Sequence, residues 1–433
     1  MRAGSLVLIV LTLACSPSGS DSDGGSVGDQ RIDARSDGAA DSGEDADAGD
    51  EDSAVDLRMP DLAPPDLGPP EPPPITPLEQ VWYLTRDAAN DVLIDFRTEP
   101  PTVTCEGVIG SSPGFEGTAV FTDPETGDLL LYSDGDTILN GQTHAVLENG
   151  TEMSGDSSCT EAALVTPVPG GENAFYLFTN DTNVSEPSSL SYSIIELDRG
   201  PNGTVTEKNV PLITGNPGEA LDVVPHTNGT DFWVLAYASA AEILAFPVSE
   251  AGVGTTPVRS STGLSGSVFR ASINHTEDFD TLVLSAVTGA GGSSGFIATS
   301  TIDRTTGRVT PLNVHVDREA VGYQASISPD GTKIYFVIGN EGFLGEPHQF
   351  DLTTNTLARL STETLYGGSK LAPDGRIYWV ANRQMAIGVV EDPDAPGAAA
   401  NFQHASFDLG GCLAGFGVPN QTAAFTDFLP PLI

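Results

Sequence analysis

Apolar and polar residues alternate along this chain in short runs that tight turns connect. In Tyr323 to Val337 (YQASISPDGTKIYFV) an alternating run meets Pro-Asp-Gly, and a second apolar run follows at once. Residues 369–380 (SKLAPDGRIYWV) repeat this order about 45 residues later. Proline presets φ at the first corner of a turn, and Asp and Gly tolerate the positive φ that tight hairpins need. The pattern therefore predicts β-hairpins, and no long amphipathic helical pattern competes with it.

Four looser copies of this unit lie upstream, at residues 116–132, 161–178, 219–235 and 268–284. Self-similarity at 45 to 58 residues is typical of a β-propeller, in which each repeat forms one blade. A seventh innermost strand is predicted at Ala414 to Asn420, and the runs beginning at Val81, Val92 and Pro101 supply its partners. We expect an all-β, seven-bladed propeller closed by pairing of the N- and C-terminal strands, because closure removes exposed sheet edges. Six or eight blades are the alternatives.

The N-terminal end of the chain carries an export signal. Arg2 and the apolar run from Leu6 to Leu13, which is too short to span a bilayer, predict a signal peptide over residues 1–14. Leu13-Ala14-Cys15 resembles a bacterial lipobox, so Cys15 is the predicted lipidation site and membrane anchor. Ser16 after the cysteine favours sorting to the outer membrane. An ordinary secretory signal with an incidental cysteine is the alternative.

Residues 15–79 are acidic and then proline-rich, with 17 acidic against 3 basic residues. Such a stretch cannot bury enough apolar surface to offset its chain entropy, so it predicts a disordered tether before a propeller over residues 80–433. The formal net charge of the whole chain is −42, and about −28 of it lies outside this tether. Charge of this sign repels nucleic acid and anionic lipid, so no nucleic-acid partner is expected.

Three cysteines lie in the predicted propeller: Cys105, Cys159 and Cys412. No C-x-x-C motif accompanies them, so zinc binding and haem attachment have no support. One disulfide with one thiol left over is expected in an exported chain, and all three pairings remain open.

Two levels of resemblance follow from these repeats. The Ser-Pro-Asp-Gly stretch at 328–336 is similar to the TolB-type, WD40-like propeller repeat. The folded region as a whole resembles a propeller domain at the start of large secreted Bacteroidetes-type proteins, which often carry PKD domains and a type IX secretion tail. The stretches that carry this resemblance include Trp82-Tyr83, Glu116-Gly117, 130–135, 228–234, 372–378 and 417–420. The lipobox and the acidic tether depart from that pattern, which argues against type IX secretion.

The candidate site lies where innermost strands begin. Glu116, Glu161 and Glu219 open three consecutive blades, and Asp222 and His226 follow in the third. Because innermost strands line the central channel, these side chains are predicted to converge at one mouth, where clustered carboxylates would hold Ca²⁺. In the alternative interpretation, each Glu accepts hydrogen bonds from backbone amides or faces solvent. No catalytic residue and no other cofactor is predicted, and Trp82, Trp233 and Trp379 are expected in the core.

These features predict a membrane-anchored lipoprotein of the cell envelope whose monomeric propeller binds a protein or a glycan without catalysis. Two alternatives remain. One is a calcium-dependent hydrolase of the propeller lactonase kind, which needs channel carboxylates around a metal. The other is a subunit of an envelope complex, as the TolB resemblance implies.

Overall fold

The structure is a computed structural model that describes most of the predicted propeller. The described residues are 80–84, 91–106, 116–181, 189–215, 217–238, 242–264, 268–288, 294–318, 323–340 and 344–420. The predicted signal peptide, the lipidation site Cys15 and the predicted tether lie outside them. Among the described residues, no helix is long and apolar enough to cross a membrane.

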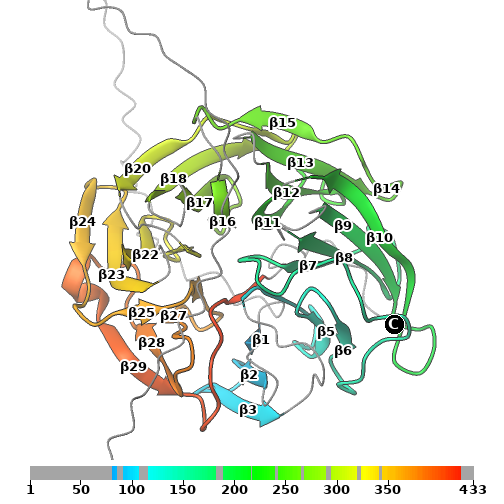
Figure 1. Cartoon of the computed structure of the whole chain (residues 1–433), viewed down its shortest axis with the longest axis horizontal. Helices are drawn as coiled ribbons and strands as arrows, with labels where there is room; N and C mark the ends of the chain where they lie inside the picture. The colour runs from blue at the N-terminus through cyan, green and yellow to red at the C-terminus, as the bar shows by residue number, and fades with distance from the viewer. Residues whose placement is uncertain are drawn as a thin grey trace, which may run out of the picture. The chain divides into compact units, whose positions relative to one another are not determined.

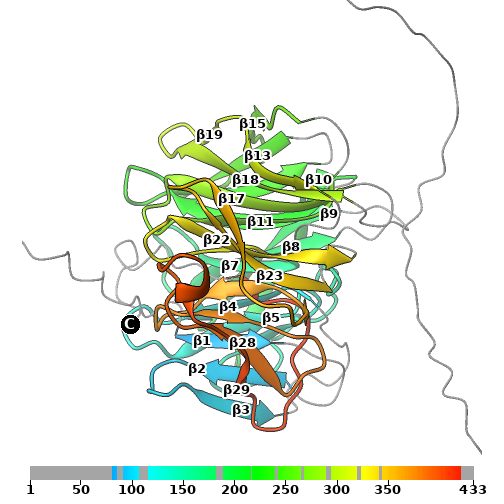
Figure 2. The same ribbon diagram turned by 90° about the vertical axis from the view of Figure 1, so that its left-hand side faces the viewer.

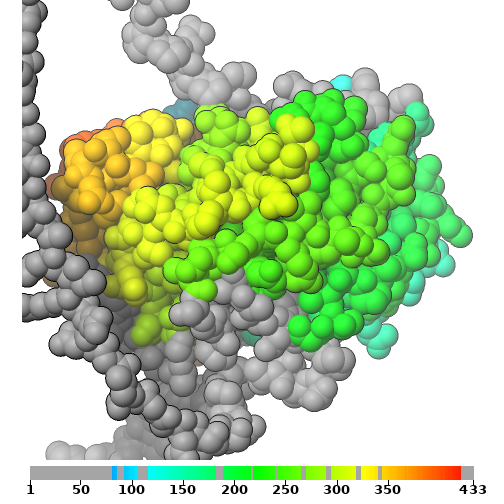
Figure 3. All heavy atoms as spheres, turned by 90° about the horizontal axis from the view of Figure 1, so that it is seen from above, coloured from blue at the N-terminus to red at the C-terminus, as the bar shows by residue number. Residues whose placement is uncertain are grey.

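Seven β-sheets stand around one axis, so the described residues form a seven-bladed β-propeller (Figure 1). The predicted fold class is therefore confirmed. Within these residues the strands are joined by turns and loops, with one short 3-10 helix at Gly397–Ala400. Figure 2 shows the blades from the side, and Figure 3 shows the green to yellow part of the chain packed together along one side of the ring.

We number the blades along the chain from the first predicted repeat. Blade 1 contains β4 (Thr118–Thr122), β5 (Leu129–Ser133), β6 (Ile138–Asn140) and β30 (Pro419–Asn420). Blade 2 contains β7 (Ala163–Pro167), β8 (Ala174–Asp181), β9 (Ser189–Glu196) and β10 (Thr204–Thr214). Blade 3 contains β11 (Pro217–Pro225), β12 (Phe232–Ala238), β13 (Glu242–Ser249), β14 (Gly252–Val253) and β15 (Val258–Ser261).

The other four blades contain three to five strands each. Blade 4 contains β16 (Val268–His275), β17 (Thr281–Thr288), β18 (Ser294–Asp303), β19 (Arg308–Val309) and β20 (Asn313–Arg318). Blade 5 contains β21 (Ser326–Ile327), β22 (Lys333–Asn340), β23 (Leu344–Asp351), β24 (Thr356–Arg359) and β25 (Leu365–Tyr366). Blade 6 contains β26 (Ser369–Leu371), β27 (Ile377–Trp379), β28 (Ala386–Val390) and β29 (Phe402–Asp408). Blade 7 contains β1 (Val81–Leu84), β2 (Asp91–Asp95) and β3 (Thr102–Glu106).

The Pro-Asp-Gly sequences form the predicted hairpin turns. Gly331 has φ +70° and its N–H donates to the Ser328 carbonyl oxygen at 2.9 Å. Gly375 has φ +79° and its N–H donates to the Ala372 carbonyl oxygen at 3.0 Å. Glycine adopts this left-handed conformation without the steric cost of a Cβ. Phe279 occupies the corresponding position in blade 4 with φ +60°.

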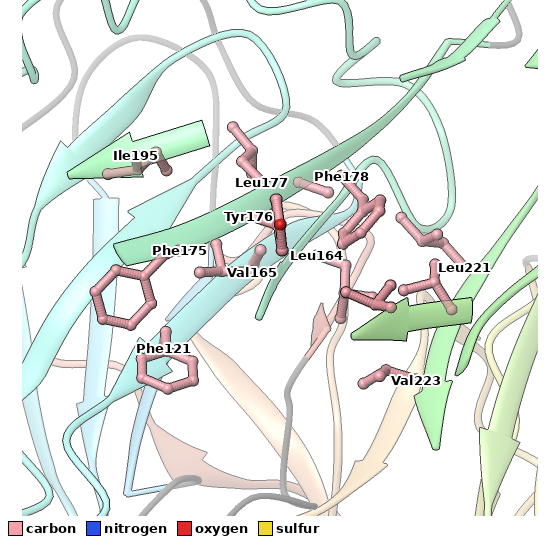
Figure 4. Packing of buried hydrophobic residues seen from close by; sticks show 14 of the residues in the cluster. Phe121, Leu164, Val165, Phe175, Tyr176, Leu177, Phe178, Ile195, Leu221 and Val223 are labelled. Atoms are coloured by element: carbon pink, nitrogen blue, oxygen red, sulfur yellow. The ribbon is translucent and has the colours of Figure 1, made fainter. Parts of the chain in front are cut away.

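Apolar side chains fill the spaces between neighbouring blades. In Figure 4 the ring of Phe121 from blade 1 lies beside Phe175 from blade 2, with centroids 5.0 Å apart in an edge-on arrangement. Leu221 and Val223 of blade 3 belong to the same buried cluster. Each blade thus buries its faces against its neighbours, which gives a chain of this size several connected cores.

The three tryptophans lie in these cores, as predicted. Trp82 and Trp379 are fully buried, and only 7% of Trp233 is exposed. The Trp233 indole N–H donates to the Arg304 carbonyl oxygen at 2.8 Å.

The two ends of the propeller meet, but the C-terminal strand has a different partner from the expected one. β30 pairs in parallel with β4, with Pro419 opposite Thr118, whereas the sequence suggested Val81–Leu84. Val418 still packs in one cluster with Trp82 and Leu84. The C-terminal segment lies so close to β4 that a Cβ at position 417 would collide with the carbonyl oxygen of Glu116. Gly417 has no Cβ, so this close approach is possible. Glycine at this position permits the pairing of β30 with β4, which the pattern of apolar residues did not predict.

A disulfide between Cys105 and Cys412 also joins the two ends, with Cα atoms 5.9 Å apart. Cys105 belongs to β3, the last strand in the order of blade 7. Of the three pairings that the sequence left open, the structure contains this one. Cys159 is buried and takes no part in this disulfide.

Candidate functional site

Six polar side chains meet near the axis, where they connect blades that are distant in sequence. We call them the axial network: Glu116, Glu161, Glu219, Tyr323, Gln324 and Asn420. All six are at most 9% exposed. Most of them lie just before or at the start of an innermost strand. The repeat therefore places polar side chains of several blades near the centre of the ring.

Glu161 connects three blades. It precedes β7 of blade 2, and its Oε2 accepts hydrogen bonds from Leu221 N of blade 3 at 2.6 Å and Ile273 N of blade 4 at 3.3 Å. Both donors belong to innermost strands, whose inner edge has no further strand to pair with. One carboxylate thus satisfies two backbone N–H groups that would otherwise be buried without a partner.

Glu219 and Glu116 make similar connections. Glu219 Oε2 accepts hydrogen bonds from the backbone N–H of Thr160 at 2.9 Å and from its hydroxyl at 2.5 Å, so blade 3 is joined to the start of blade 2. The Tyr323 hydroxyl donates to Glu116 Oε2 at 2.9 Å across a sequence separation of 207 residues. This last bond joins blades 1 and 5.

Gln324 and Asn420 attach the C-terminal strand to the network. Gln324 Nε2 donates to the carbonyl oxygens of Thr160 and Val418, and its Oε1 accepts from Val418 N at 3.0 Å. Asn420 Nδ2 donates to the carbonyl oxygen of Leu221 at 3.1 Å. Neither residue was predicted from the sequence. The sequence contained one indication of Gln324, which is its position in the repeat. It precedes Ala-Ser-Ile in blade 5, as Arg270 precedes Ala-Ser-Ile in blade 4.

Burial dominates the electrostatics of the axial network. It raises the pKa of Glu116 to about 8, with a further contribution from Glu219, while Arg270 and the Tyr323 hydroxyl oppose the shift. Burial also raises the pKa of Glu161 well above its usual value, against the hydrogen bonds from Leu221 and Ile273. Desolvation disfavours the charged form of a carboxyl group. Glu116 is therefore largely protonated at neutral pH.

The predicted acidic residues do not converge as metal ligands in the part of the chain that the structure describes. No group of three or more His, Cys, Asp or Glu side chains there could hold a metal ion. Glu161 and Glu219 instead accept backbone N–H groups, which matches the alternative interpretation of these glutamates.

Asp222 and His226 occupy different places. Asp222 Oδ2 lies 2.8 Å from His275 Nδ1, so this pair joins the innermost strands of blades 3 and 4. His226 lies in the hairpin turn of blade 3, where its Nε2 contacts the Thr305 carbonyl oxygen at 3.0 Å. The sequence analysis missed His275, which ends the innermost strand of blade 4 at the repeat position that Pro225 holds in blade 3.

Comparisons with known proteins leave the family and the activity of this chain undefined. No family model matches the chain, and no curated protein matches it in sequence. A hypothetical selenium-binding protein from Sulfolobus tokodaii is 9% identical, with 81% of this chain and 97% of that chain covered and a TM-score of 0.47. The periplasmic gluconolactonase of Pseudomonas aeruginosa is 10% identical, with 80% and 98% covered and a TM-score of 0.46.

Structures of TolB proteins also occur among the matches. TolB from Acinetobacter baumannii is 11% identical, with 78% of this chain and 82% of that chain covered and a TM-score of 0.34. Likeness at these values carries no information about ligands or activity. The class that the fold defines is a seven-bladed β-propeller.

Proposed function

We propose that this chain is a lipoprotein held outside the cytoplasm, and that its propeller is a non-enzymatic binding or scaffold module. The observation that supports the second part most strongly is the use of the axial glutamates. Glu161 and Glu219 hold backbone amides of neighbouring blades, and Glu116 holds Tyr323. The centre of the ring is thereby stabilised, and the outer surfaces are left for recognition.

Two observations support a location outside the cytoplasm. Leu13-Ala14-Cys15 follows an apolar export signal, and the Cys105–Cys412 disulfide is of a kind that persists in oxidising compartments. An acyl-anchored protein with an acidic tether would hold its propeller away from the membrane surface. The resemblance of stretches such as residues 417–420 to Bacteroidetes-type secreted proteins extends the proposal to kinship with that propeller family.

Replacement of the predicted anchor tests the location. Wild-type protein and Cys15→Ser would be expressed in a bacterial host, labelled with an alkyne-bearing fatty acid and separated into membrane and soluble fractions. We expect label and membrane association for the wild type only. Equal membrane association of both proteins, or no label on either, would refute the anchor and would not affect the binding proposal.

The choice between binding module and calcium-dependent hydrolase is tested with the metal. The melting temperature of the purified protein would be followed with and without millimolar Ca²⁺, together with a lactone-hydrolysis assay. The binding proposal predicts no calcium-dependent activity and no shift. Hydrolysis that needs Ca²⁺ and is lost in Glu219→Gln would overturn it. Stoichiometric co-purification with one envelope protein would identify the chain as a complex subunit.

A further inference from the structure

A groove lies between blades 5 and 6, away from the axial network. It encloses about 330 Å³. Blade 5 lines it with Leu344 and with residues near β25, and blade 6 lines it with residues of the β27–β28 connection, β28 and β29. The side chains that matter for recognition are Leu344, Leu365, Asn382, Gln384 and His404, around the bare backbone of Gly388.

An irregular strand pairing accompanies the groove. Ile387 pairs with Phe407, but the next paired residue of β28 is Val389, opposite Gln403. Residues 404–406 of β29 therefore oppose Gly388 alone. Ala405, within this bulge, has φ +49°. Bulges and left-handed non-glycine residues cost free energy and are over-represented at functional sites.

The apolar surface around the groove is unusual for this protein. The described residues include three large hydrophobic side chains that are more than a third exposed, and two of them are at this place. Leu344 lines the groove with 39% of its surface exposed, and Met385, between the lining residues Gln384 and Ala386, is 56% exposed. Leu365 adds a buried aliphatic wall. An apolar wall beside polar groups is typical of small-molecule sites.

The polar side chains of the groove are available to a ligand. Within the described part of the chain, the structure gives no hydrogen bond to the side-chain amides of Asn382 and Gln384, and Gln384 is exposed. His404 Nδ1 lies 2.7 Å from Glu363 Oε2, so the one basic group of the lining is already matched by a carboxylate. Amide groups both donate and accept hydrogen bonds, as sugar hydroxyls do.

We propose that this groove binds one neutral sugar unit of a glycan. The inference rests on the proposed binding function and adds its site and ligand class. The exposed aliphatic side chain of Leu344 fits the C–H face of a pyranose ring, while Asn382 and Gln384 bind its hydroxyl groups. The volume is at the small end of the range for small-molecule sites, which suits a single ring. The net charge of about −28 outside the predicted tether disfavours acidic sugars.

Binding to the full-length protein would be measured by ligand-observed NMR and calorimetry. The probes are glucose, galactose, mannose and N-acetylglucosamine, with glucuronate and sialic acid as the acidic comparison. Asn382→Ala combined with Gln384→Ala removes both amides, and Gln403→Ala is the control because Gln403 is exposed on neighbouring β29 and outside the lining. Ala386→Met, a second variant, narrows the groove without removing a polar group.

We expect at least one neutral probe to bind, and both groove variants to weaken it about tenfold or more while Gln403→Ala leaves it unchanged. Melting temperatures close to the wild-type value would show that the variants fold. Absence of binding by all four neutral sugars overturns the inference, as does binding that the groove variants do not alter. In either case, capture of a protein partner or of another glycan would still support the proposed function.

Discussion

Polar side chains at the axis of the ring differ from those in the groove between blades 5 and 6 in their burial and in their hydrogen bonding. At the axis, Glu161 before blade 2 is 1% exposed and accepts hydrogen bonds from backbone amides of blades 3 and 4. In the groove, the amide of Gln384 is exposed and makes no hydrogen bond within the described residues. Buried polar groups must be paired, and pairing across blades stabilises a ring. The comparison teaches that carboxyl groups at a propeller's centre can serve to join its blades.

The largest expected effect comes from the covalent closure, which acts independently of the axis. Cys105→Ser removes the disulfide without leaving a cavity, because Cys105 is exposed. A cross-link that closes so long a loop stabilises by about 2–5 kcal/mol. We expect a loss of that order in the free energy of unfolding, measured by denaturant titration.

Reduction of the wild type provides the control. Dithiothreitol should lower wild-type stability to the level of Cys105→Ser and leave the variant unchanged. If the variant and the wild type unfold at the same denaturant concentration, the disulfide does not stabilise the protein, and the axial network and the blade interfaces close the ring without it.

The second effect is a dependence of stability on pH that originates at the axis. The pKa of Glu116 is raised from 4.5 to about 8 in the folded protein. A raised pKa means that the folded state favours the protonated form of Glu116. The contribution of this protonation to the stability of the protein is complete below pH 4.5 and is lost as the pH rises through 8. We expect the free energy of unfolding to fall between pH 5 and pH 8 by an amount on the order of 2–4 kcal/mol.

Glu116→Gln isolates this contribution, since the amide cannot ionise and can still accept from Tyr323. The variant should show a shallower fall over the same range. A residual slope is expected because the pKa of Glu161 is raised in the same direction. A variant whose stability depends on pH as steeply as that of the wild type would contradict the assignment.

The smallest effect is expected in the hairpin turns, away from both regions. Gly331→Ala places a Cβ at φ +70°, 3.2 Å from Thr276 Cγ2. Gly375→Ala places one at φ +79° with nothing within 4 Å. We expect a loss of about 1 kcal/mol for Gly375→Ala and slightly more for Gly331→Ala. Thermal melting checks both, and a stabilised Gly375→Ala would show that the turn does not require left-handed backbone.

The sequence predicted what depends on local chemistry. Pro-Asp-Gly turns and alternating strands gave the hairpins, the number of blades and the buried tryptophans. Contacts between distant residues were harder to foresee. The bond from Tyr323 to Glu116 and the parallel pairing of β30 with β4 depend on where blades meet in space. No local pattern encodes that position. The repeated Glu before the innermost strands is visible in the sequence, but its hydrogen-bond partners in other blades are not.

The groove could not be predicted for a related reason. It depends on the register slip between β28 and β29 opposite Gly388 and on the approach of blade 5 to blade 6. Neither the single glycine nor Ala405 signals a bulge in the sequence. His226 was misplaced because the end of an innermost strand was taken to face the channel, whereas it lies in a turn that contacts the next blade.

The central claim is that the axial glutamates hold the blades together, and Glu161 tests it most directly. The free energy of unfolding would be measured at pH 6 for the wild type, Glu161→Ala and Glu161→Gln. Alanine leaves the N–H groups of Leu221 and Ile273 without their acceptor, so we predict a loss of about 2–4 kcal/mol, most of which glutamine recovers through its amide oxygen. Equal stability of all three proteins would contradict the account.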